Sequence, residues 1–313
     1  DVTSVDSVGI ITGRVLINAQ KQVHVGTGVS VKAGGINVTA GITTVQALQA
    51  TTGTFSSTGS FGGDITVNSV TVGKGANSVS TNVVLGQSAL DASVTGGNNV
   101  AIGNVAMSDA TTAADSTAVG AGALNAVTTG SYNTAVGKSA LLLATTGSNN
   151  TAVGKDALRA NTTASNNTAI GIDALTANTT GTENVATGAL SLTTNTTGDF
   201  NSAFGRSALK LNTTGDSNTA IGKDALLANT TANNNTAVGK GSMVSNTTGS
   251  TNTAVGMQSL EANTTGDSNV AIGVNALLSN TTADYNTAVG KSALQVNTTG
   301  QNNTAIGIEA LDA

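Results

Sequence analysis

The chain carries few side chains that could do chemistry. Its single histidine, His24, lies in the segment Gln22-Val23-His24-Val25, and the sequence has no cysteine. Without a second histidine or a thiol, the sequence shows no nucleophile paired with a base. Copies of His24 from several chains could bind a metal ion at a shared axis, although a strand histidine is more commonly exposed or packed. We therefore expect no enzyme activity, no metal site and no cofactor.

The acidic side chains that could act as a general acid or base recur at one position of a repeated unit. Asp156, Asp173 and Asp224 occupy this position, and a lysine often precedes it, as in Lys155-Asp156. Residues that recur at one position of a repeat lie on one face of the fold. We interpret these charges as a solvated stripe that keeps an edge soluble.

Two further motifs are similar to known modification or metal-binding motifs. Asn161-Thr162-Thr163 matches the acceptor motif for N-glycosylation, but copies recur in most units and so read as a by-product of the repeat. The oxygen-bearing side chains of Gly215-Asp216-Ser217-Asn218 could bind Ca²⁺. They lack the spacing of calcium-binding β-roll repeats, and we interpret both motifs as parts of turns.

Glycines define the organisation that positions these side chains. Fourteen of them stand 17 residues apart, with no insertion or deletion between them. They are Gly86, Gly103, Gly120, Gly137, Gly154, Gly171, Gly188, Gly205, Gly222, Gly239, Gly256, Gly273, Gly290 and Gly307. A fixed period of this size is the signature of a stacked repeat fold, in which each unit contacts only its neighbours.

The pattern within one unit predicts strands. Read from its glycine, the unit is G-x-x-A-L-x-x-N-T-T-G-x-x-N-T-A-V, with its apolar residues in two short groups, T-A-V and A-L. An amphipathic helix would need apolar residues every three or four positions, and Asn, Thr and Gly favour turns. We predict two short strands and two turns in each unit. The fold class is then all-β, a parallel β-roll or β-solenoid about 60 Å long at about 4.8 Å per coil.

Each recurring position has an expected structural role. The glycines supply a positive φ or a close backbone approach at a corner. Val153 and Ile170 represent an apolar column before the glycine, and Leu158 and Leu175 represent a second one after it. We expect both columns to stack as apolar ladders. The asparagine columns, represented by Asn150 and Asn167 and by Asn161 and its copies down to Asn297, should form ladders of bonded amides.

This core is thin for a chain of its length, because each coil offers only two large apolar side chains. We therefore expect further burial between chains, and three chains around one axis would supply it. Charged residues make up 9% of the 313 residues and the net charge is −5, which argues against a nucleic-acid partner. No apolar run is long enough for a transmembrane helix, so we expect no membrane insertion.

The period also divides the chain. Residues 1–65 lack it and predict a thin β-rich shaft, with strand-like runs such as Val29-Ser30-Val31-Lys32. Residues 66–85 predict a shorter transition coil, because Gly73 precedes Gly86 by 13 residues. Residues 86–313 form the 17-residue-repeat region, whose last coil is incomplete.

The strings Asn99-Val100-Ala101-Ile102-Gly103 and Asn269-Val270-Ala271-Ile272-Gly273 resemble a repeat in the heads of trimeric autotransporter adhesins of the YadA type. That resemblance implies a parallel β-roll built as an intertwined homotrimer that binds host surfaces. The coils of that family are shorter, and the additional residues here fall in the N-T-T-G turn.

The segments from Asp1 to Thr12 and from Thr51 to Ser56 resemble tail-fibre proteins of T4-like phages, especially cyanophages. This resemblance implies a homotrimeric fibre segment of a virion, with other fibre proteins as partners. A host receptor, glycan or protein, would be bound through parts that can lie outside this segment.

Two other functions remain open at this point. One is the head of a bacterial adhesin at the cell surface. The other is an ice-binding solenoid, because threonine ladders can order water. The adjacent Thr162-Thr163 pair argues against ice binding, since neighbours in a strand point to opposite faces.

Overall fold

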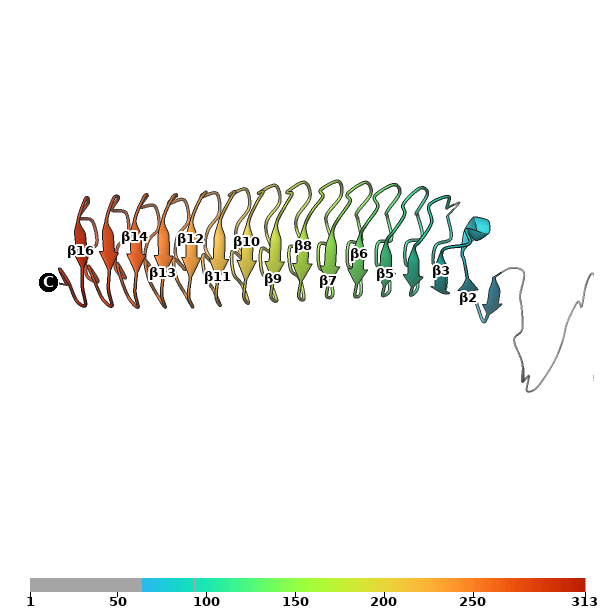
Figure 1. Ribbon diagram of the computed structural model, residues 1–313, viewed down its shortest axis with the longest axis horizontal. Helices are drawn as coiled ribbons and strands as arrows, with labels where there is room; N and C mark the ends of the chain where they lie inside the picture. The colour runs from blue at the N-terminus through green and yellow to red at the C-terminus, as the bar shows by residue number, and fades with distance from the viewer. Residues whose placement is uncertain (1–63, 93, 313) are drawn as a thin grey trace, which may run out of the picture. The chain divides into compact units, whose positions relative to one another are not determined.

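The structure is a computed structural model that describes residues 64–92 and 94–312. These residues form one 16-stranded sheet whose strands follow each other in chain order. From β3 onward each strand is parallel to the next, and Figure 1 shows the coils stacked as a rod. The predicted all-β fold, a parallel β-solenoid of 17-residue coils, is thereby confirmed. The predicted shaft lies outside the described residues, apart from residues 64 and 65.

The strands are short and evenly spaced. They are β1 (Ile65–Val67), β2 (Val70–Gly73), β3 (Val83–Gly86), β4 (Val100–Ile102), β5 (Thr117–Val119), β6 (Thr134–Val136), β7 (Thr151–Val153), β8 (Thr168–Ile170), β9 (Val185–Thr187), β10 (Ser202–Phe204), β11 (Thr219–Ile221), β12 (Thr236–Val238), β13 (Thr253–Val255), β14 (Val270–Ile272), β15 (Thr287–Val289) and β16 (Thr304–Ile306). A short 3-10 helix, η1 (Ala76–Ser78), precedes β3.

Each coil contains one regular strand, whereas the sequence predicted two. The strand is the T-A-V segment, as in β7. The A-L segment is a turn, because its leucine is left-handed, with φ +51° at Leu158, and strands require a negative φ. The turn still bonds to the next coil, since the Leu158 amide donates to the Ala174 carbonyl at 3.0 Å. The prediction of a second strand is wrong because apolar content alone does not define a strand.

A hairpin precedes the first parallel coil and lies in the first part of the transition segment expected at residues 66–85. β1 pairs antiparallel with β2, and β2 pairs antiparallel with β3. The loop residues Asn68 and Ser69 both have positive φ, +48° and +67°, which matches the two-residue turn that suits a twisted hairpin. The hairpin covers the otherwise open edge of the first parallel strand.

Small side chains and amides fill the interior around one large apolar column. In one coil the buried side chains are those of Ala157, Leu158, Asn161, Ala164, Asn167 and Ala169. The leucine and methionine column contributes the largest fully buried side chains of the described residues. Its fully buried members are Leu90, Met107, Leu124, Leu141, Leu158, Leu175, Leu192, Leu209, Leu226, Met243, Leu260 and Leu277.

The valine and isoleucine column faces outward, which corrects the expectation that it belongs to the core. Val153 is 37% exposed and Ile170 is 41% exposed. Side chains alternate along a strand, so with Ala152 buried, its neighbours Thr151 and Val153 point away from the interior. The column still stacks, because in-register pairing places Val153 beside Ile170.

The repeat glycines occupy a corner where no other residue fits. Gly154 has φ +142°, a conformation that residues with a side chain rarely adopt. A Cβ atom added to it would lie 2.4 Å from the Gly171 carbonyl oxygen in the next coil. Both reasons inferred from the sequence, a positive φ and a close approach, therefore hold here. The same geometry recurs at Gly103, Gly120 and Gly137.

Candidate functional surfaces

Two asparagine columns hold the coils in register from inside, as the sequence predicted. In one column, Nδ2 of Asn178 donates to Oδ1 of Asn161 at 3.0 Å and to the Gly181 carbonyl at 2.8 Å. In the other, the Asn167 backbone amide donates to Oδ1 of Asn150 at 3.0 Å. These buried amides bond to the chain itself, so they are satisfied. Their arrangement makes them structural side chains with no free group for a ligand.

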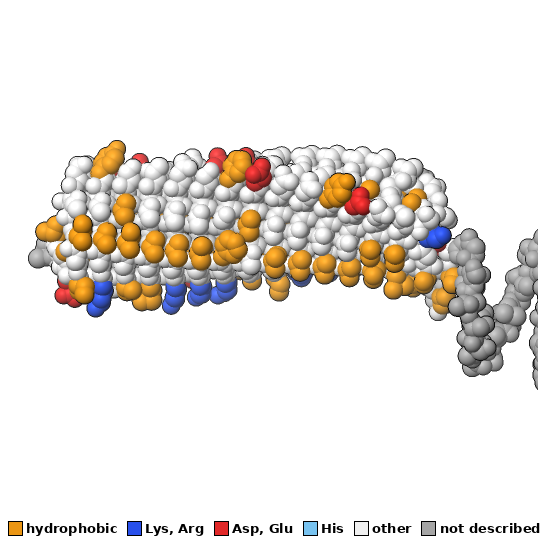
Figure 2. All heavy atoms as spheres, in the orientation of Figure 1, with side chains coloured by type: hydrophobic (Ala, Val, Ile, Leu, Met, Phe, Trp, Pro, Cys, Tyr) orange, Lys and Arg blue, Asp and Glu red, His pale blue; other side chains and the backbone are white. Residues whose placement is uncertain are grey.

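The most continuous feature of the outer face is an apolar stripe formed by the residue before each repeat glycine. The stripe consists of Leu85, Ile102, Val119, Val136, Val153, Ile170, Thr187, Phe204, Ile221, Val238, Val255, Ile272, Val289 and Ile306. Figure 2 shows a row of hydrophobic side chains running along the rod. Full burial of such a side chain stabilises by about 1.5–3 kcal/mol, so partial exposure leaves roughly 1 kcal/mol per coil unrealised in a single chain.

Ion pairs lie along the edge that follows the repeat glycines. Lys155 Nζ is 3.0 Å from Asp156 Oδ2, and Lys223 Nζ is 3.2 Å from Asp224 Oδ2. The hydrogen bond to Asp156, with the negative charges of Asp156 and Asp173, raises the pKa of Lys155 above 10.5. Exposed pairs of this kind contribute little to stability. The shallow hollow beside them is lined by Lys138, Ser139, Lys155, Asp156, Arg159, Asp173 and Thr176.

The structure also places the two polar motifs. Asn161 of the glycosylation motif is fully buried, so the folded chain cannot present it as an acceptor. In the candidate calcium motif, Asn218 is buried in an asparagine column, whereas Asp216 is half-buried. Oδ1 of Asp216 accepts the Asp199 backbone amide at 2.8 Å. The two oxygen donors therefore do not face a common ion.

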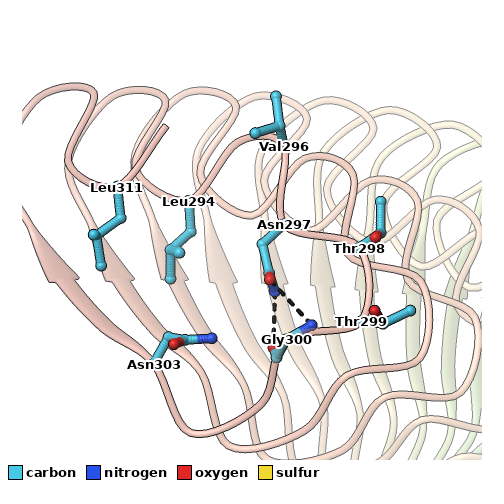
Figure 3. A pocket seen from close by; sticks show the side chains of 8 residues that line it. All are labelled: Leu294, Val296, Asn297, Thr298, Thr299, Gly300, Asn303 and Leu311. Carbon is cyan, nitrogen blue, oxygen red and sulfur yellow. Dashed lines mark hydrogen bonds between the residues drawn. The ribbon is translucent and has the colours of Figure 1, made fainter. Parts of the chain in front are cut away.

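A hollow at the C-terminal end of the stack is the open end of the columns (Figure 3). Leu311 is 61% exposed there, although its counterparts in the preceding coils are buried. Asn297 bonds within its own turn, with Nδ2 donating to the Gly300 carbonyl and Oδ1 accepting the Gly300 amide. The hollow is lined by Leu294, Val296, Asn297, Thr298, Thr299, Gly300, Asn303 and Leu311. It lies on the surface that a coil presents to the next coil in the stack, and no charged side chain lines it.

The described part of the chain contains no group of three or more His, Cys, Asp or Glu side chains placed to hold a metal ion. Within the same residues, no helix could span a membrane. His24, whose copies could bind a metal ion at a shared axis, lies outside them. No protein family model matches the chain, and no match is found among curated proteins or solved structures.

Proposed function

We propose that this chain is a structural and adhesive fibre segment in which three parallel copies pack around one axis through the apolar stripe. The stripe is the observation that carries the proposal. It is continuous over the whole repeat, and only Thr187 interrupts it with a polar side chain. A rod that stays in register along its length can bring every coil of one stripe against a second copy. The proposed activity is mechanical, with no enzymatic step and no cofactor.

Packing around an axis suits the geometry of the rod. The in-register strands make the outer face regular, and threonines such as Thr151 flank the stripe on the same face. Closed symmetric assemblies bury the same patch from each copy and leave none exposed. Contacts between chains then bury the apolar surface that the thin core of a single chain leaves exposed. The number three comes from the two family resemblances.

The resemblances also support a place in a virion, as part of a tail fibre that spans distance and supports attachment to a host receptor. Immunogold electron microscopy with antibodies against residues 86–313 tests this assignment. We expect gold particles on the tails of virus particles. Labelling confined to bacterial cell surfaces would reject the fibre and favour an adhesin head.

Ice binding is a second candidate, favoured by one observation. Thr151 and Val153 lie on the same outward face, and pairing with Thr168 and Ile170 repeats this array in the next coil at about 4.8 Å. Most strands have threonine at the position of Thr151, whereas β3, β4, β9 and β14 have valine there and β10 has serine. Thr162, the basis of the earlier objection, lies outside the strands. Ice binding requires the apolar stripe to be exposed to water, whereas the proposed fibre covers the stripe with other copies of the chain. Thermal hysteresis by a monomeric chain would support ice binding, and its absence in a trimeric chain would reject it.

A further inference from the structure

Three aromatic side chains stand on one outer ridge of the rod, away from the apolar stripe. Tyr132, Phe200 and Tyr285 are 62%, 54% and 61% exposed. All three occupy the coil position just before the buried asparagine of the N-T-A-V segment. They are separated by four coils and by five coils, or about 19 Å and about 24 Å along the axis. We call these three residues the aromatic ridge.

The backbone at this position does not favour an aromatic residue. Tyr132, Phe200 and Tyr285 have φ values of +61°, +58° and +58°. The left-handed region costs an ordinary residue roughly 1–2 kcal/mol, and asparagine, aspartate and small polar residues tolerate it best. Eight of the ten other residues at this position are asparagine, aspartate or serine, and the remaining two are Glu183 and Thr251. The ten residues are Asn98, Asp115, Asn149, Asn166, Glu183, Ser217, Asn234, Thr251, Ser268 and Asn302.

Stability of the coil therefore does not account for the aromatic ridge. A side chain more than half exposed gains little from burial, and asparagine at the same position has a conformation suited to the backbone. Bulky residues held in a costly conformation on a surface point to a role in binding. Aromatic rings are also the side chains that most often anchor a bound partner.

The charges around the aromatic ridge restrict the partner. Asp115 lies one coil before Tyr132, Glu183 lies one coil before Phe200, and Asp284 directly precedes Tyr285. Side chains one coil apart in this column can reach each other, since Asn98 Nδ2 donates to Asp115 Oδ1 at 2.9 Å and Thr251 Oγ1 lies 3.0 Å from Ser268 Oγ. Neither this column nor the one before it contains a lysine or arginine in the repeat region. The surface therefore disfavours an anionic ligand.

We propose that the aromatic ridge binds an uncharged polysaccharide laid along the rod. The apolar C–H face of a sugar ring stacks on an aromatic ring, and sugar hydroxyls donate hydrogen bonds to the neighbouring carboxylates. An extended polymer contacts all three aromatic positions at once, so weak individual sites combine into a stronger one. The proposal deepens the adhesive role proposed above, on which it rests for its biological meaning.

Tyrosine fluorescence reports on this surface directly. The sequence has two tyrosines and no tryptophan, and both tyrosines, Tyr132 and Tyr285, belong to the aromatic ridge. The full chain is titrated with dextran, mannan and agarose oligosaccharides as neutral probes, and with heparin as an anionic one. We expect a saturable change with at least one neutral probe and none with heparin. No change with any neutral probe, or equal binding of heparin, would overturn the proposal.

Variants separate binding from folding. In Tyr132→Asn/Phe200→Asn/Tyr285→Asn, each ridge residue becomes the asparagine found in neighbouring coils, so its melting temperature should equal or exceed that of the original chain. Its migration in affinity gels with the bound polysaccharide should no longer be retarded. Phe200→Asn alone, which keeps both tyrosines, should bind about tenfold more weakly. Leu143→Ala removes an exposed apolar side chain elsewhere and should bind normally.

A triple variant that binds as tightly as the original, or that melts several degrees lower, would overturn the proposal. The second result would mean that the aromatic rings stabilise the coil. These readouts do not depend on the number of chains or on a place in a virion. If the fibre assignment holds and the ridge binds no sugar, only this inference fails.

Discussion

The close approach of successive glycines makes the repeat unusually sensitive to a single methyl group. Gly222→Ala would place a Cβ atom 2.6 Å from the Gly239 carbonyl oxygen, at a residue with φ +135°. The obstacle is backbone, which cannot rotate aside. Ordinary contact needs at least 3.4 Å, so the two coils must separate locally. That movement stretches the bond from the Gly239 amide to the Ile221 carbonyl, now 2.7 Å long.

The expected cost follows from these two effects. A side chain in this region of φ costs about 1–3 kcal/mol, and each disturbed hydrogen bond between coils costs about 1 kcal/mol. We expect Gly222→Ala to lose roughly 3–5 kcal/mol of unfolding free energy. Gly241→Ala is the matched control, because its φ is +66° and the nearest atom, Gln258 Cγ, is 3.8 Å away. The control should lose about 1 kcal/mol, the ordinary cost of a left-handed residue.

Hydrogen exchange with mass spectrometry is the appropriate assay, since stacked repeats open locally and need not unfold in one step. We expect faster exchange in the coils that contain Gly222 and Gly239, with distant coils unchanged. Urea melts of both variants give the accompanying global measure. Equal effects of Gly222→Ala and Gly241→Ala would refute the close-packing argument.

Three other outcomes are expected from the interior and from the charged edge. Leu226→Asp should lower the free energy of unfolding by at least about 4 kcal/mol in a thermal melt, because it buries an unpaired charge in the leucine column; an unchanged melting temperature would mean that the leucines face solvent. Asn212→Ala should cost about 2–5 kcal/mol by urea melt, because it leaves buried partners unsatisfied in both neighbouring coils, and a cost below 1 kcal/mol would contradict the ladder. Asp156→Asn should return the raised pKa of Lys155 toward 10.5 in an NMR titration. Any stability from that pair is complete at neutral pH and is lost as pH rises through the raised pKa, so the difference in melting temperature between the variant and the original chain should shrink as the pH is raised through that range.

The period, the fold and the order of the coils could be predicted from the sequence because the repeat is strict. The unit at Gly188 has an alanine and a leucine two residues early, at Ala189-Leu190, but it keeps the register, with Ser191 and Leu192 buried in the A-L positions. The asparagine ladders were also predictable, since a polar residue that recurs at an inward position needs a partner in the next coil. In a stacked fold that partner is its own copy.

The sequence alone did not determine whether the side chains of the valine and isoleucine column point into the core or toward solvent. Thr151, Ala152 and Val153 alternate, so either the alanine or its two neighbours must face inward. The pattern of an ordinary sheet predicts that the larger apolar residue faces the core. In this narrow cross-section the leucine column and two asparagine columns already fill the space, and alanine is the side chain that fits.

Backbone conformation was the other feature that the sequence concealed. A leucine such as Leu158 with a positive φ contradicts local preference, and only its complete burial in the stack makes the conformation favourable. For the same reason the exposed left-handed position of Phe200 could not be recognised before the structure was known. The signal for it was an aromatic residue in a column made up mostly of asparagine, aspartate and serine.

The native mass of the chain is the most direct test of the central claim that the apolar stripe is an interface between copies. Light scattering of the original chain should give about three times the single-chain mass of 30.3 kDa. Val153→Lys/Ile170→Lys should keep the coil folded, since both side chains point outward, and should reduce the mass toward that of one chain. A single-chain mass for the original protein, or a lysine variant that remains trimeric, would contradict the account.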